Sequence, residues 1–300
     1  MAEKGFSYTA MTAETDRLLP AVRKTILAHS VLGREIPVFE IGKGERSVLY
    51  VGAHHGSESI TAALLCDFLS ELVRRSAETV CGVSLPYLLS HRRLIVVPML
   101  NPDGVEYAVN GTGEENPLFR RVLAMNKERG NDLTRWQANA RGVDLNHNYD
   151  AGFAAYKNIE QSRGLISGAP SGFSGEYPES EPESAALARF IRAQYPSLGG
   201  VLTLHTQGET IFCGKPEGNP PLTEAVCRLL EKTTGYRREI PQGSAAYGGL
   251  TDWCLEKTDL PAFTLECGKG ENPLPMQSRR KIYERLRAAL FSLPIWLTRK

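Results

Sequence analysis

Short apolar runs alternate along the chain with segments of helical periodicity. Four continuous apolar runs, at residues 47–53, 94–100, 200–204 and 262–266, predict strands buried on both faces. Apolar residues recur at helical spacing over residues 60–73 and again over residues 279–293. Strands that alternate with helices in this way predict an α/β protein with helices on both faces of a central sheet.

A further helix is expected to begin near Glu181. Ser180 and Glu183 have the spacing of a capping box, and Pro182 is tolerated in a first helical turn. The Gly- and Ser-rich stretch at residues 164–177 predicts a surface loop before this helix. Because strands of one apparent sheet lie on both sides of that loop, we expect one domain over residues 1–300.

Composition limits the partners of this chain. Its 300 residues carry a formal net charge of +1, which favours neither nucleic acid nor an anionic membrane. No stretch reaches the roughly 18 apolar residues of a membrane span, and the first residues lack a signal-peptide pattern, so we expect a cytoplasmic protein. The six cysteines form no C-x-x-C pair and are expected to remain thiols in a reducing compartment.

Polar side chains suited to chemistry follow the predicted strands at their carboxyl ends. His55 and Glu58 follow the first strand, Asn101 follows the second, His205 follows the third, and Glu266 ends the fourth. Ligands of open α/β sheets bind at this edge, so these side chains are expected to share one site.

His55, Glu58 and His205 offer the ligand set of one Zn²⁺ ion per chain, with a fourth position left for water. In a hydrolytic site of this kind a separate carboxylate accepts the proton of the water. Glu266 is placed for that role, since it stands at a strand end and is not needed as a ligand. His54 is the alternative to His55, but only His55 has a glutamate three residues later. We therefore expect His54 to pack behind the site.

These motifs resemble the zinc carboxypeptidase family, whose type member is pancreatic carboxypeptidase A. The matching segments are GAHHGSE at 52–58, NPDG at 101–104, RGVDLNHN at 141–148, His205, and FTLE at 263–266. They occur in the family's order and cover residues from about 45 to about 270. The resemblance implies a single zinc-peptidase domain with a mixed, mostly parallel sheet of about eight strands. It also implies that His55, Glu58 and His205 bind the metal and that Glu266 is the general base of a peptide hydrolase.

The resemblance further implies an arginine that stabilises the oxyanion. Arg141 is favoured, because it lies just before the VDLN run. Arg135, beside Trp136, is the alternative, because a short connection leaves the alignment ambiguous.

Two of the expected substrate contacts depart from the family pattern, and a third sets the expected specificity. Family members that trim ordinary C-termini read Asn-Arg where this chain reads Asn146-His147, and an imidazole binds a carboxylate less firmly than a guanidinium. Tyr247 precedes the GGLTDW segment, where it is either a mobile phenol near the leaving group or a packed loop aromatic. Thr251 aligns with the floor of the specificity pocket, which makes a large apolar side chain an unsuitable substrate group.

Bacterial relatives with altered clamp residues include peptidases that cut γ-D-glutamyl-diamino acid bonds of cell-wall (murein) peptides. By analogy, Thr206, Gln207 and Glu209 are candidates for polar substrate contacts, and recycling of imported wall fragments fits a cytoplasmic enzyme.

Two other functions compete with a peptidase. One is a zinc-dependent amide deacylase of the succinylglutamate desuccinylase and aspartoacylase type, which usually carries an added β-rich part, whereas residues 267–300 here have a mostly helical pattern. The other is a non-catalytic zinc- or peptide-binding relative. The presence of all three candidate ligands and of the candidate base argues against it.

Overall fold

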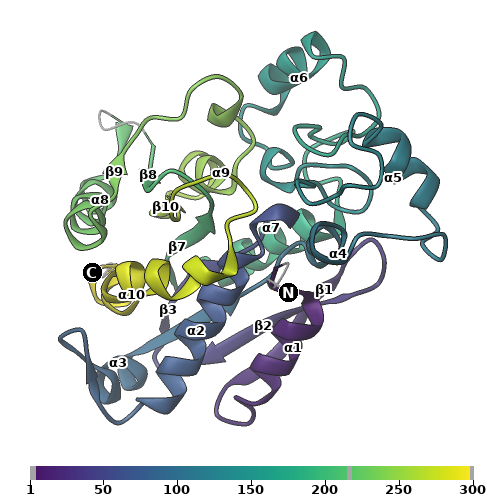
Figure 1. Cartoon of the computed structure of the whole chain (residues 1–300). Coiled ribbons are helices and arrows are strands. Elements are labelled where there is room, and N and C mark those ends of the chain that lie inside the picture. The colour runs from purple at the N-terminus through teal and green to yellow at the C-terminus, as the bar shows by residue number, and fades with distance from the viewer. Residues whose placement is uncertain (1–4, 215–217, 298–300) are drawn as a thin grey trace.

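One eight-stranded sheet runs through the molecule in the computed structural model, which describes residues 5–214 and 218–297 (Figure 1). Its strands, in spatial order, are β1 (Arg23–His29), β2 (Glu35–Ile41), β6 (Arg92–Val97), β3 (Arg46–Val51), β7 (Leu198–His205), β10 (Ala262–Glu266), β8 (Thr210–Phe212) and β9 (Arg237–Arg238). The four central strands pair in parallel, and antiparallel pairs flank them on both sides. This arrangement confirms the expected α/β fold with a mixed sheet of eight strands. β4 (Thr79–Val80) and β5 (Val83–Ser84) form a separate small hairpin.

Helices cover both faces of the sheet, and the strand residues explain why. In β3, Val48 and Tyr50 enter one hydrophobic cluster, whereas Leu49 and Val51 enter another. Because successive side chains of a strand point to opposite faces, such a strand needs an apolar layer on each side. One face is covered by α2 (Ile60–Arg74), α8 (Pro221–Thr234) and α10 (Arg279–Trp296). The other face is covered by α7 (Pro182–Gln194) and α9 (Leu250–Lys257).

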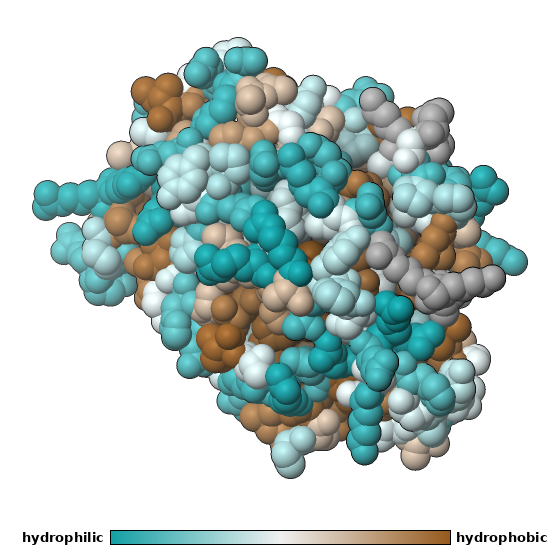
Figure 2. Space-filling view, turned by 180° about the vertical axis from the view of Figure 1, so that it is seen from behind, coloured by the Kyte–Doolittle hydropathy of each residue, from teal (hydrophilic) through white to brown (hydrophobic). Residues whose placement is uncertain are grey.

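The other helices lie around this frame and in the long crossover between β6 and β7. They are α1 (Tyr8–Asp16), α3 (Leu85–His91), α4 (Pro102–Asn110), α5 (Phe119–Met125) and α6 (Phe153–Ser162), with the short 3₁₀ turns η1 (Gly56–Glu58), η2 (Leu145–His147), η4 (Gly243–Ala246) and η5 (Met276–Ser278). None of the helices within residues 5–214 and 218–297 combines the length and apolar character that a bilayer span requires. Figure 2 shows polar and apolar residues interspersed over the back of the molecule. The cytoplasmic location stays a prediction.

The expected capping box of α7 is wrong. Glu181 is the N-cap, and its side chain does not bond the helix N-terminus. Ser180 instead donates to the carboxylate of Glu181, and Glu183 accepts from the backbone N–H of Val31. The reason is tertiary: the acidic side chains of this turn are drawn to partners from distant segments.

The expectation of six free thiols is also wrong. Cys213, just after β8, forms a disulfide with Cys227 in α8. Fourteen residues separate the two positions, so no short motif marks the pair. Cys267, beside the expected base, remains a thiol and is buried.

The loop predicted at residues 164–177 lacks regular structure but is not wholly on the surface. Phe173 and Ser174 are buried, and the carboxylate of Glu160 in α6 accepts hydrogen bonds from the backbone N–H and hydroxyl of Ser174. This anchoring fixes the loop beside the carboxyl edge of the sheet.

Candidate metal centre and active site

The carboxyl ends of three neighbouring strands carry the expected chemical groups. β7 ends at His205 and β10 ends at Glu266, and these two residues are paired in register. β3 is followed by a short connection that places His55 before η1 and Glu58 within it. Parallel pairing of these strands is what brings residues from positions 55 and 205 together.

Two backbones meet closely beneath His55, and glycine makes this possible. A Cβ at Gly56 would lie 2.2 Å from the carbonyl oxygen of Gly104. Asn101 caps α4 by accepting from the N–H of Gly104, and its Nδ2 donates to the carbonyl of His54. The NPDG motif therefore holds the segment that carries the metal-binding candidates.

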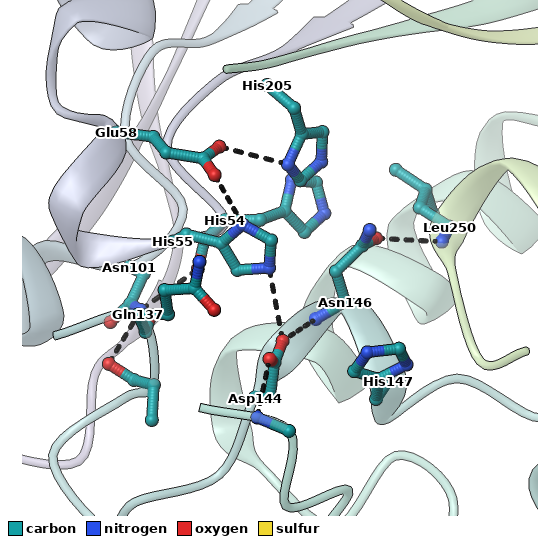
Figure 3. Close-up of polar contacts among 12 residues, drawn as sticks. His54, His55, Glu58, Asn101, Gln137, Asp144, Asn146, His147, His205 and Leu250 are labelled. Carbon is teal, nitrogen blue, oxygen red and sulfur yellow. Dashed lines mark hydrogen bonds and ion pairs between the residues drawn. The ribbon is translucent and has the colours of Figure 1, made fainter. Parts of the chain in front are cut away.

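His55, Glu58 and His205 converge on one point (Figure 3). Nδ1 of His55 lies 2.9 Å from Oε1 of Glu58, and Nδ1 of His205 lies 3.1 Å from its Oε2. One ligand atom from each residue lies within 4.8 Å of the others. Two imidazole nitrogens and a carboxylate are the donors of many catalytic zinc sites, so the residues fit the ion.

Asp144 orients His55. Its Oδ1 lies 3.1 Å from Nε2 of His55, and its Oδ2 accepts from the backbone N–H of Gly172 (Figure 3). A carboxylate at Nε2 keeps the proton there and leaves Nδ1 free for a metal. Asp144 belongs to the RGVDLNHN segment, but sequence reasoning gave it no role.

The charges of these groups are strongly coupled. Burial alone would raise the pKa of Glu58, but the charge and hydrogen bonds of His55, together with those of His205, lower it to about 2. Burial and the charge of Glu58 raise the pKa of Glu266 to about 8. A carboxylate with raised basicity is suited to accept a proton near neutral pH.

Glu266 lines a cavity of about 160 Å³ together with His55 and His205. The wall of this cavity also includes Thr251, whose hydroxyl lies 2.7 Å from that of Thr264. Thr251 therefore lines the cavity that contains the metal-binding candidates, and its place at the floor of a specificity pocket stays a prediction.

Asn146 and His147 line the same cavity. Oδ1 of Asn146 accepts from the backbone N–H of Leu250, which leaves its amide N–H groups available (Figure 3). Nδ1 of His147 lies 2.8 Å from the carbonyl oxygen of Tyr247, and its ring stacks on Tyr156 with 4.1 Å between centroids. His147 is thus held in place with Nε2 left for a ligand.

Tyr247 lies outside the walls of this cavity. Its ring packs against Gly152, where an added Cβ would come within 2.6 Å of it. Of the two readings of Tyr247, this conformation favours the packed loop aromatic.

The structure does not bring either candidate arginine to the metal-binding group. Arg141 points to Glu181, with 3.4 Å between Nη1 and Oε2, and 47% of its side chain is exposed. Arg135 pairs with Glu271 in a second, outer cavity of about 820 Å³. Neither arginine lines the inner cavity that contains His55 and His205.

Other expected contacts divide between the two cavities and the interior. His54 is buried behind the site, beside the hydroxyl groups of Tyr149 and Thr203. Thr206 and Gln207 line the outer cavity, whereas Glu209 pairs with Lys269 and Arg285 away from it.

Besides Asp144, two further residues at the site were not identified from the sequence. Asn272 donates to Oε1 of Glu58 and to the carbonyl of Thr206, and Gln137 lines both cavities. In the sequence, Gln137 could have been noticed only because it directly follows Trp136, the neighbour of the candidate Arg135.

The fold and the site together define an α/β protein with a His-Glu-His group that could hold a metal ion. Residues 8–288 match the model of the zinc carboxypeptidase (peptidase M14) family, and the chain belongs to this zinc-dependent family. It is a hydrolytic metallopeptidase.

The relatives include bacterial and animal enzymes. The chain is 31% identical over 287 residues to the γ-D-glutamyl-L-diamino acid endopeptidase 1 of Lysinibacillus sphaericus, covering 94% of this chain and 70% of that protein. It shares its fold with bovine thrombin-activatable fibrinolysis inhibitor, solved with a tick carboxypeptidase inhibitor, with a TM-score of 0.70, 20% identity, and coverage of 97% and 95% of the two chains. It also superposes on the murein-tripeptide amidase of Escherichia coli O157 with a TM-score of 0.54, 19% identity, and coverage of 94% and 100%.

Proposed function

We propose that this chain is a zinc-dependent peptidase that hydrolyses γ-D-glutamyl-diamino acid bonds in cell-wall peptides. The observation that carries the proposal is the inner cavity, which His55, His205, Glu266 and the Asn146–His147 pair line together, with Glu58 completing the metal-binding group beside it. The names of the relatives from Lysinibacillus sphaericus and Escherichia coli support a murein-derived substrate.

The reaction needs a nucleophile and a proton carrier. Bound Zn²⁺ polarises the scissile carbonyl and lowers the pKa of water. His55 and His205 hold the ion with Glu58, and Asp144 fixes the ring of His55. Glu266 accepts the proton of the attacking water and passes it to the leaving nitrogen, a step worth roughly 10²–10⁴-fold in rate.

Asn146 and His147 bind the polar end of the substrate. The free amide N–H groups of Asn146 are suited to a carboxylate. Nε2 of His147 donates when the ring is protonated and accepts when it is neutral, so it serves a carboxylate or an amine. A diamino acid carries both groups.

The charges around the cavities favour a substrate with an amino group. Asp252 lines the inner cavity, and Glu239 and Glu271 line the outer one. Among the described residues of the outer wall, Arg135 is the only Lys or Arg, and it is paired with Glu271. Burial and the charge of Glu256 raise the pKa of Asp252 only to about 6, so it is mostly ionised at neutral pH. Carboxylates at these positions attract an amine and repel a purely acidic ligand.

Product analysis by mass spectrometry tests the proposal. The zinc-loaded enzyme is incubated with a γ-D-glutamyl-diaminopimelate peptide and, side by side, with an ordinary peptide of equal length. We expect cleavage of the γ-D-glutamyl bond at a kcat/KM at least about tenfold above that for the ordinary peptide. Equal rates on both would remove the substrate assignment, and bound zinc without any turnover would favour a binding protein.

A further inference from the structure

Gln137 occupies a fixed place between the loop of residues 164–177 and the segment that carries His55. Its backbone N–H donates to the carbonyl of Pro170, and its own carbonyl accepts from the N–H of Gly56 and from Nδ2 of Asn101. These bonds belong to the main chain, so the side chain is not needed to hold the backbone.

The side-chain amide of Gln137 is available for a ligand. It takes part in no hydrogen bond with the residues that the structure describes, although the side chain is only half exposed. Figure 3 shows Gln137 beside His55, and both residues line the inner cavity.

Gln137 also lies at the junction of the two cavities. Gln137, Phe212, Ala245 and Glu266 line both of them, and Gln137 and Glu266 are the two polar residues of this set. A peptide that extends from the outer into the inner cavity passes between these side chains. Its scissile carbonyl then lies between the proposed base and the amide.

No arginine reaches that junction within residues 5–214 and 218–297. Arg141 is turned to Glu181, and Arg135 lies in the outer cavity on Glu271. Developing negative charge on the carbonyl oxygen needs a hydrogen-bond donor that is already in place, and a side-chain amide is an adequate one.

We propose that Gln137 is the oxyanion-stabilising catalytic residue of this enzyme, an inference that rests on the peptidase function proposed above. As the water oxygen bonds to the carbonyl carbon, the π electrons move onto the carbonyl oxygen, and Nε2–H of Gln137 donates to it. Glu266 takes the water's proton and returns it to the nitrogen as the carbon–nitrogen bond breaks. The amide stays neutral throughout.

The test compares variants of the zinc-loaded full chain. Removal of one oxyanion donor lowers kcat by roughly 10²–10³-fold, and we expect that loss for Gln137→Ala and Gln137→Glu, with KM within about threefold of wild type. Gln137→Arg, which restores a donor, should recover part of the rate. Arg141→Ala is the matched control and should stay within about threefold of wild type.

A second readout avoids dependence on turnover. A phosphinic analogue of the cleaved peptide carries a tetrahedral anion, and calorimetry should show that Gln137→Ala binds it at least about thirtyfold more weakly than wild type. Zinc content and melting temperature, measured for each variant, separate this effect from misfolding.

The outcomes are separable from the substrate assignment. Kinetics use whichever of the two peptides the wild type cleaves faster, so failure on the wall peptide alone leaves the Gln137 comparison intact. If neither is cleaved, affinity for the phosphinic analogue decides. A Gln137→Ala enzyme within about threefold of wild type in kcat and in analogue affinity overturns the inference, as does a loss of kcat confined to Arg135→Ala.

Discussion

Replacing Asp144 by asparagine should weaken zinc binding although Asp144 is not a ligand. The carboxylate has partners on both oxygens: Oδ1 faces Nε2 of His55 at 3.1 Å and accepts from the backbone N–H of Asn146 at 3.2 Å, and Oδ2 accepts from the N–H of Gly172 at 2.9 Å. Asparagine keeps one acceptor oxygen and adds two donors in place of the other. An asparagine can therefore satisfy the partners of only one of the two oxygens.

Both orientations of the new amide have a cost. If its NH₂ faces His55, the ring must accept at Nε2 and carry its proton on Nδ1, the atom required for the metal. Loss of such an orienting carboxylate weakens metal binding by about 10–100-fold, or about 1.4–2.8 kcal/mol. If the NH₂ faces Gly172 instead, a buried backbone N–H loses its acceptor, which costs about 1–3 kcal/mol of stability.

Zinc affinity is measured by competition with a chromophoric chelator, and stability by urea unfolding of the metal-free protein. Glu160→Gln is the matched control, because Glu160 is also a buried carboxylate that accepts from a backbone N–H, that of Ser174. Within the part of the chain that the structure describes, no hydrogen bond or ion pair joins Glu160 to the metal-binding group. The control substitution should lower stability and leave zinc affinity unchanged. The reasoning would be refuted by an Asp144→Asn protein whose zinc affinity and whose equilibrium constant of unfolding both lie within twofold of wild type.

Three further outcomes follow from the same geometry. Glu266→Gln should keep its zinc and lose roughly 10²–10⁴-fold in kcat, so activity within threefold of wild type would show that another group is the base. His147→Ala should raise KM several-fold with little change in kcat. Tyr247→Phe should change neither constant by more than twofold, because the ring packs outside the cavity. Steady-state kinetics checks both, and a large effect of Tyr247→Phe with none of His147→Ala would contradict them. Burial, together with the charge of Asp103, raises the pKa of Glu183 to about 7, so the folded state binds this proton more tightly than the unfolded chain and loses stability as pH rises from about 4.5 to about 7. Glu183→Gln should therefore gain on the order of 3 kcal/mol relative to wild type between pH 4.5 and 7.5, and parallel urea-unfolding profiles of the two proteins would contradict this.

Local pattern was sufficient for the elements that carry the metal-binding candidates. The apolar runs before His55 and His205 are strands because continuous apolar residues need cover on both faces, and the structure places them at β3 and β7. Glu266 ends the last of the four apolar runs, and parallel pairing of that strand with β7 places it beside His205. The capping of α7 and the disulfide at Cys213 were not predictable in this way, since each depends on partners that no short spacing marks.

The sequence by itself determined the α/β alternation and the strand-end positions of the candidate ligands and of the candidate base, because strand periodicity and strand-end chemistry are local properties. Tertiary structure alone decided which polar groups reach the reacting centre. Arg141 and Gln137 lie four residues apart, yet one pairs with Glu181 and the other lines both cavities. Contacts with segments distant in sequence set these positions: the backbone N–H of Gln137 bonds to residue 170, and the guanidinium of Arg141 pairs with residue 181. Those contacts exist only after the crossover between β6 and β7 has packed.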